Sequence, residues 1–512
     1  MPVSNPFDVI GVKLPVALAL TTAALGLPAA QASGASGNPP STLSLAAFIA
    51  NECSSAALAN DPLDASVCEL DAEQVGTSAY EYGIPLMEFE RQAQAQTSVT
   101  VPNDLSDAPV NQLGSDSQLN SPQPGHQVFV QPNVDTLYTM GHLNLKSGPL
   151  VLHVPRIANR RYYVFQFLDP YTNTFAYVGT RTTGDGAGSY LITGPGWRGK
   201  VPKGLHQVKS SYEQVWLCGR TLVNGPHDLA AVHAIQRKYQ LIPLAQYRRH
   251  GLKWKPPRPR KVIAAASNPQ VPTGLAFYAK LGQYLKQNPP PAADGPELQA
   301  LSEVGIGPGL DPAKAGLSAP VLSGLAEASD DGLSNITNER TTYAAESAVT
   351  HDGWFVPGAD TGNFGTDYEW RAIVAVYGLG ANEPAEAMYI VGVIDQDDQK
   401  LDAGNDYVIH FAAGSLPPAR YFWSLTMYDS NFSLVPNAIN RYALANHIPG
   451  LKYNADGSLD IYVQHAEPPA SERSDWLPAP ASGNFEVTLR LYGPDADALN
   501  GKYVYPTITR TG

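Results

Sequence analysis

The spacing of apolar residues changes several times along the chain. Residues 43–58 are apolar at helical intervals, and residues 71–91 form a second helical candidate. The Gly-Ile-Pro run at 83–85 predicts a kink or an interruption there, because proline removes a backbone donor and restricts the residue before it. Short β-branched and aromatic runs between turn signals predict strands in residues 127–218 and again from 372, with helices in between.

This pattern predicts an α+β protein that is mostly β, with two β-sandwich or jelly-roll-like domains joined by helices. Val487, Leu489 and Leu491 alternate with Glu486, Thr488, Arg490 and Tyr492, which is typical of a half-buried strand. The expected divisions are 1–32 for an export signal, 33–125 for a helical segment and long loop, 126–260 for the first β-rich domain with its C-terminal helix, 261–350 for a connector of helices and loops, and 351–512 for the second β-sandwich domain.

The N-terminus has the features of an export signal. Lys13 precedes the apolar run 14–27, and the small-residue pattern at 30–32 precedes Ser33, a plausible cleavage point. We therefore expect a secreted or periplasmic protein. In such a chain the neighbouring Cys53 and Cys68 predict a local disulfide, with two free buried thiols as the alternative.

The charge balance limits the partners. The formal net charge of −13, from 34 Lys and Arg against 47 Asp and Glu, repels a phosphate backbone and argues against general nucleic-acid binding. Residues 248–261 hold seven Lys and Arg among prolines; this run fits a polyanion patch or a solvated linker, and the net charge favours the linker. No segment approaches a membrane span, so we expect no membrane partner once the signal is removed. The expected partner is a small-molecule substrate, and self-association stays open.

Several segments together resemble a known family. Residues 131–138 read Gln-Pro-Asn-Val-Asp-Thr-Leu-Tyr, and they resemble the signature of proteins that carry two domains of unknown function in tandem, the twelve-fifty-four type followed by the twelve-fourteen type. The likeness continues through 151–244 and 406–510. It implies a β-rich, two-domain architecture and frequent export, with no agreed reaction.

The same eight residues contain the first candidate site. Asp135 is expected to act as a base or ligand, with Asn133 orienting it and Tyr138 donating a hydrogen bond. The alternative is a structural turn, because Asn and Asp side chains bond readily to their own backbone. No cofactor is predicted; a divalent metal held by His126, His142 and Asp135 is a further alternative.

Other polar groups are candidates for substrate binding. Tyr171 follows a very apolar strand, and Arg181 lies ten residues further along. Arg181 is expected to bind a substrate carboxylate in bidentate fashion; the alternative is a loop salt bridge to Asp169 or Asp185. Tyr82 belongs to a Tyr-x-Tyr-Gly-x-Pro segment that the family also has.

The last candidates lie in the second β-rich block. Asn437 and Arg441 follow an aromatic strand, and with Asn440 they would make a polar lining for an anionic ligand. The alternative is a loop clamp in which Arg441 pairs with Asp429.

These candidates predict an exported enzyme of unknown specificity that hydrolyses a small polar or carboxylated organic molecule. The alternative is a non-catalytic ligand-binding or assembly protein in which the polar loops are structural. The chain has no Gly-x-Ser-x-Gly elbow, dinucleotide fingerprint or phosphate loop, so these common enzyme signatures do not specify the chemistry.

Overall fold

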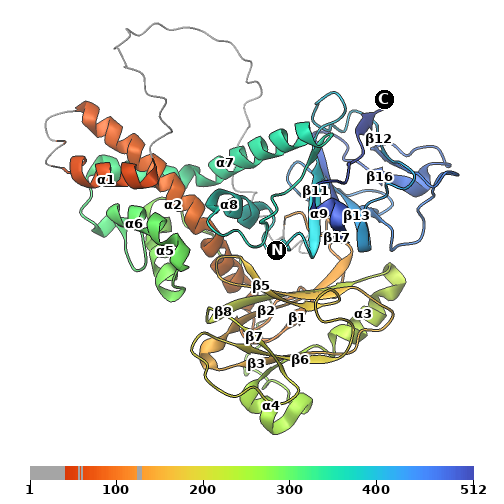
Figure 1. Ribbon diagram of the computed structural model, residues 1–512, viewed down its shortest axis with the longest axis horizontal. Helices are drawn as coiled ribbons and strands as arrows, with labels where there is room; N and C mark the ends of the chain where they lie inside the picture. The colour runs from red at the N-terminus through yellow and green to blue at the C-terminus, as the bar shows by residue number, and fades with distance from the viewer. Residues whose placement is uncertain (1–40, 56–57, 59–61, 124–129, 264) are drawn as a thin grey trace, which may run out of the picture.

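The computed structural model describes residues 41–512 except 56–57, 59–61, 124–129 and 264. The expected export signal, His126 and the predicted strand residues 127–129 lie outside these residues. The described chain is α+β, with two β-sandwiches and a layer of helices beside them (Figure 1). No described helix combines the length and apolar character that a membrane crossing would need.

The first sandwich consists of a five-stranded and a four-stranded sheet, in the orders β1-β2-β8-β4-β5 and β7-β6-β3-β9. Alternate residues of the two sheets, among them Leu143, Phe165 and Leu217, form the core between them. Its elements are β1 (Gly114–Ser115), β2 (Thr136–Asn144), β3 (Leu150–Val154), β4 (Tyr163–Leu168), β5 (Thr174–Gly179), β6 (Gly188–Thr193), β7 (His206–Lys209), β8 (Gln214–Leu222), α3 (Leu229–Gln236), β9 (Gln240–Pro243) and α4 (Leu244–His250).

The second sandwich repeats this plan with the orders β10-β11-β17-β13-β14 and β16-β15-β12-β18. Ile409, Leu425 and Leu489 lie in its core. Its elements are β10 (Trp354–Phe355), β11 (Ala387–Gly392), β12 (Tyr407–Phe411), β13 (Ala419–Asp429), β14 (Ala443–Ala445), β15 (Leu459–Gln464), β16 (Trp476–Pro478), β17 (Phe485–Pro494), α9 (Ala496–Leu499) and β18 (Ile508–Arg510).

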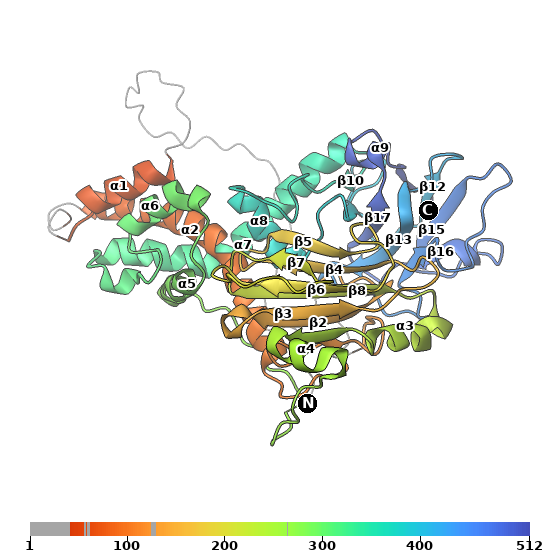
Figure 2. The same ribbon diagram turned by 60° about the horizontal axis from the view of Figure 1, so that its bottom comes forward.

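The helices form a third unit with its own apolar core. The two long helices α2 and α7 pack along each other so closely that a Cβ on Gly324 of α7 would lie 2.1 Å from the Glu69 carbonyl oxygen of α2. The layer consists of α1 (Thr42–Glu52), α2 (Pro62–Thr97), α5 (Leu275–Gln287), α6 (Gly295–Glu303), α7 (Ala319–Thr350) and α8 (Tyr368–Tyr377). Figure 2 shows α1, α5 and α6 at one end of the first sandwich, and α7 continues from there to β10 of the second.

One expectation from local patterns was wrong, and of the two alternatives at residues 83–85 the interruption does not occur. The β-branched run at 372–377 belongs to helix α8, because the Asp367 side chain caps the helix at the Trp370 amide and apolar helices bury the segment. Helix α2 continues through Pro85, since the residues around that proline are packed on both sides. In both places tertiary burial outweighs local propensity.

The predicted disulfide between Cys53 and Cys68 is confirmed. It joins the end of α1 to the first turns of α2 across a sequence separation of 15 residues. In the chain-entropy model such a closed loop contributes about 3 kcal/mol to stability. The disulfide therefore holds α1, which is short, on the helical layer.

Candidate functional site

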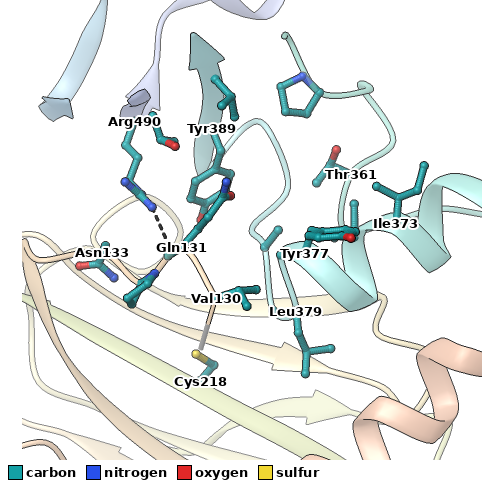
Figure 3. A pocket seen from close by; sticks show the side chains of 18 of the residues that line it. Val130, Gln131, Asn133, Cys218, Thr361, Ile373, Tyr377, Leu379, Tyr389 and Arg490 are labelled. Atoms are coloured by element: carbon teal, nitrogen blue, oxygen red, sulfur yellow. Dashed lines mark hydrogen bonds between the residues drawn. The ribbon is translucent and has the colours of Figure 1, made fainter. Parts of the chain in front are cut away.

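A cavity lies where the two sandwiches and helix α8 meet (Figure 3). Its volume is about 120 Å³, somewhat below the roughly 150 Å³ of an engineered apolar cavity that admits benzene. Most of its surface is apolar, with Trp216, Ile373 and Leu379 among the lining side chains. A small number of polar groups in an apolar pocket is the usual composition of a small-molecule site.

Two central strands supply the polar lining through their alternation. On β8, Trp216, Cys218 and Arg220 face the cavity while Val215 and Leu217 enter the core of the first sandwich. On β17, Thr488, Arg490 and Tyr492 face it while Leu489 and Leu491 enter the core of the second. Each sandwich thus turns a polar and aromatic sheet face toward the other, because side chains alternate along a strand.

Arg490 is the most unusual group in the cavity. It is only 2% exposed. Its Nη1 donates to the Thr426 hydroxyl at 2.9 Å, and its Nη2 donates to the Tyr428 hydroxyl at 2.7 Å and to the Gln131 carbonyl at 2.8 Å. Within the described part of the chain, its Nε has no acceptor and no carboxylate lies within ion-pair distance. A buried guanidinium whose hydrogen-bond partners are all neutral lacks a direct ion-pair partner for its charge.

The protonation of Arg490 is secure. Burial alone would lower its pKa, but the neighbouring oxygens of Tyr428, Tyr492 and Asp135 outweigh burial and raise the pKa above the usual value. Thr488, two residues before Arg490 and on the same face of β17, has a buried hydroxyl that makes no hydrogen bond to any described residue. A positive charge and an unpaired hydroxyl therefore lie on one face of β17.

Arg220 is a second buried arginine with neutral partners. It is 6% exposed and donates to the Gln166 amide oxygen and to the Gly380 carbonyl, each at 2.8 Å. Its guanidinium lies over the Tyr138 ring at 5.6 Å. The cavity's third arginine, Arg340, differs because it forms an ion pair with Glu486 at 2.9 Å. The described lining therefore carries an excess of positive charge.

The structure places Asn133 and Tyr138 at this cavity. The Asn133 side-chain oxygen accepts from the backbone amides of Asp135 and Thr136 at 3.0 and 2.8 Å, and its amide nitrogen donates to the Tyr138 hydroxyl at 2.6 Å. Burial raises the pKa of Tyr138 above its usual value. Asn133 thus holds the turn and also fixes a phenol that faces the cavity.

Asp135 lies behind the lining, where the two sandwiches touch. Its Oδ2 accepts from the Ser424 hydroxyl at 2.6 Å, and its Oδ1 lies 3.8 Å from the Nε2 of His447. Among described residues, Oδ1 has no hydrogen-bond partner, and the backbone of Val223 lies beside the His447 ring. Burial lowers the pKa of His447, and the charge of Asp135 opposes this. A neutral imidazole and a carboxylate therefore face each other without a direct bond.

The predicted tyrosines are brought together elsewhere. Tyr82 and Tyr171 surround the guanidinium of Arg371, each ring centre 5.8 Å away, with Tyr368 at 5.0 Å. Tyr82 and Tyr368 donate to the buried carboxylate of Asp294 at 3.1 Å. This cluster lies in the helical layer and does not line the cavity.

The remaining candidates bond within the protein. Arg181 donates to Glu386 at 2.6 Å, so its partner is neither Asp169 nor Asp185. Arg441 donates to the carbonyls of Arg473 and Trp476, and Asn437 bonds to the backbone of Arg441. These three side chains do not line the cavity. No group of three or more His, Cys, Asp or Glu side chains suited to a metal ion occurs in the part of the chain that the structure describes.

Sequence reasoning did not single out Arg220 or Arg490. Each stands in an apolar strand, in Leu-Cys-Gly-Arg-Thr-Leu and in Leu-Arg-Leu. An arginine on the polar face of a strand is normally taken to face water. The one available signal is that each belongs to a long strand, and long strands are often central in their sheets.

Two family models match parts of this chain. Residues 110–243 match the family model described as a protein of unknown function, DUF1254, and residues 386–496 match a second, DUF1214. Curated proteins include no significant match.

Two solved structures are similar to this chain. The crystal structure of the VPA0106 protein from Vibrio parahaemolyticus has a TM-score of 0.60 at 22% identity, covering 86% of this chain and 100% of that one, and this likeness concerns the fold alone. An uncharacterised protein from Burkholderia cenocepacia has a TM-score of 0.40 at 14% identity, covering 92% of this chain and 94% of its own. The chain thus carries a region that matches DUF1254 followed by a region that matches DUF1214.

Proposed function

We propose that the protein binds a small amphiphilic organic anion in the cavity between its two sandwiches. The observation that carries the proposal is the buried guanidinium of Arg490, whose Nε is unpaired and whose described partners are all neutral. A buried guanidinium with an unpaired Nε and no direct ion pair costs free energy, and a ligand carboxylate would supply both the ion pair and the missing acceptor. Arg220 adds a second positive charge without a carboxylate partner.

The lining also favours a ligand class. Trp216, Ile373 and Leu379 offer apolar contacts to the body of a ligand, while Arg490 and Thr488 offer donors to its charged end. A volume of about 120 Å³ is below the roughly 150 Å³ that admits benzene, so it holds a short branched chain or most of one ring. The expected ligands are therefore monocyclic aromatic or short branched aliphatic carboxylates.

Calorimetric titration of the purified protein with benzoate, and with benzamide as its neutral analogue, tests this. We expect benzoate to bind and benzamide to bind at least tenfold more weakly. Arg490→Gln should weaken benzoate at least tenfold, since a hydrogen bond to a charged group is worth about 1.5–3 kcal/mol and each 1.4 kcal/mol is tenfold in affinity. Arg161→Gln is the matched control, because that arginine pairs with Asp228 outside the cavity. Equal affinity for the acid and the amide would refute the proposal.

The second candidate function is hydrolysis of an ester or amide of such an acid. It is supported by Asp135 and His447, which lie directly behind the lining, with the unpaired Oδ1 of Asp135 3.8 Å from the Nε2 of His447. In this role they would accept a proton from water as its oxygen attacks the carbonyl carbon, and the leaving group would take up a proton as its bond to that carbon breaks. Asp135→Asn should then abolish turnover of a phenyl or benzoyl ester, while the folded variant still binds benzoate. A fully active variant would remove the catalytic assignment and leave the binding proposal in place.

A further inference from the structure

The charges of this chain are distributed very unevenly. Residues 229–293 contain eleven Lys and Arg and no Asp or Glu. The rest of the chain has the other 23 basic side chains and all 47 acidic ones. A strongly acidic protein thus concentrates positive charge in one short region. Charges that served only to keep the surface solvated would not need to be segregated in this way.

The densest part is residues 248–263, here called the basic loop. It contains Arg248, Arg249, Lys253, Lys255, Arg258, Arg260 and Lys261, all exposed. None of these seven forms an ion pair within the part of the chain that the structure describes. The seven charges are therefore available to a partner with the opposite charge.

Both ends of the basic loop are attached to the protein body. It begins in the last turn of α4, which ends at Gly251 with a positive φ of 54°. Its far end is bonded to Thr100, whose amide donates to the Ile263 carbonyl and whose hydroxyl donates to the Lys261 carbonyl, each at 2.8 Å. Prolines 256, 257 and 259 stiffen the chain between these points. In Figure 2 the chain beyond α4 extends away from the sheets.

Apolar side chains are interspersed with the charges. Val262 is 66% exposed, and Leu252 and Ile263 are each 39% exposed. Trp254 is partly exposed between Lys253 and Lys255. Lysine and arginine beside exposed tryptophan and aliphatic residues are typical of segments that lie at a membrane interface, where the charges meet lipid phosphates and the apolar groups enter the acyl boundary.

We propose that the basic loop docks the protein on the surface of a membrane that contains anionic lipid. This departs from the expectation of a solvated linker without membrane contact, and the reason is the exposed apolar residues. Nucleic acid offers phosphates as well, but it has no place for Leu252, Val262 and Ile263. Salt screens charges beyond about 8–10 Å, so the acidic remainder of the protein does not cancel the attraction at the loop. The proposal is independent of the ligand cavity.

Vesicle sedimentation tests the proposal on the full chain. We expect binding to vesicles with about 30% phosphatidylglycerol in phosphatidylcholine, at least tenfold weaker partitioning to pure phosphatidylcholine, and loss of most binding in about 0.5 M NaCl. A variant with Lys253, Lys255, Arg258 and Arg260 all changed to Gln should lose at least tenfold. Trp254→Ala should lose several-fold at unchanged charge.

The control changes four exposed basic residues of the first sandwich, Arg198, Lys200, Lys203 and Lys209, to Gln. It should bind vesicles like the unaltered protein, with the same Tm in all variants confirming the fold. Equal loss in the control and the loop variant would overturn the assignment to the basic loop. Absence of vesicle binding, with or without binding to a DNA duplex of matched phosphate concentration, would overturn the membrane proposal.

Discussion

Replacing Glu386 with Gln should weaken the contact between the two sandwiches. The Glu386 carboxylate accepts from the Tyr162 hydroxyl at 2.8 Å and from the Arg181 Nε at 2.6 Å. The glutamate side chain is 1% exposed and the arginine side chain 28%. A glutamine of the same shape keeps one acceptor, but its amide NH₂ meets the other donor. The contact therefore loses one charge-assisted hydrogen bond and leaves a donor unsatisfied.

The expected cost follows from these contacts. Hydrogen bonds to charged groups contribute about 1.5–3 kcal/mol, and we take the lower part of this range for Arg181, because water competes for its partly exposed guanidinium. Together with the unsatisfied donor, Glu386→Gln should cost about 2–3 kcal/mol. At about 2–4 °C per kcal/mol for a domain of 150–250 residues, the Tm should fall by about 4–12 °C.

A double-mutant cycle followed by circular dichroism measures this contact. Arg181→Gln leaves the buried Glu386 carboxylate with one partner, so it should also destabilise the protein. The double variant should be more stable than the sum of the single effects by about 1–2 kcal/mol, because it removes both charges. Additive single effects, or a Tm change below about 1 °C in Glu386→Gln, would refute the reasoning. Benzoate affinity should be the same in Arg181→Gln as in the unaltered protein.

Three further changes test other parts of the structure. Burial raises the pKa of Asp116 to about 7, well above the pKa of about 3.9 that an aspartate has in an unfolded chain. The folded state therefore loses stability from this group as the pH rises from about 4 to 7. Asp116→Asn should remove that decline when Tm is measured between about pH 4 and 8. Reducing the Cys53–Cys68 disulfide should cost about 3 kcal/mol, seen as a lower Tm with dithiothreitol. Gly324→Ala should cost about 1–3 kcal/mol in urea unfolding because its Cβ meets the Glu69 carbonyl, whereas Gly186→Ala, with open space around it, should be neutral.

The fold was largely predictable because its signals are local. Alternating apolar residues indicate strands wherever one face is buried, and most strands of both sandwiches follow this rule. The clear failure, the helix α8, has β-branched residues that favour a strand, and only its contacts within the helical core select the helix. The Cys53–Cys68 disulfide was predictable because both residues are close in sequence.

The candidate site was predictable only in part. Asn133 and Tyr138 could be found because a turn rich in amides and hydroxyls is visible in the sequence. Ser424 and His447 could not be assigned to Asp135, since they are about 290 and 310 residues away and meet it only when the sandwiches pack. Arg181 was chosen for its position in a loop, and its distant partner Glu386 was equally invisible.

The amino-acid order alone determined the alternation along β8 and β17, and with it the fact that each strand has one apolar and one polar face. It did not determine where the polar faces point. In the folded chain they face each other across a cavity, so Arg220 and Arg490 lose water and find only neutral partners among the described residues. The physical reason is that a strand's own residues set which side chains share a face, whereas the packing of distant elements sets what that face meets.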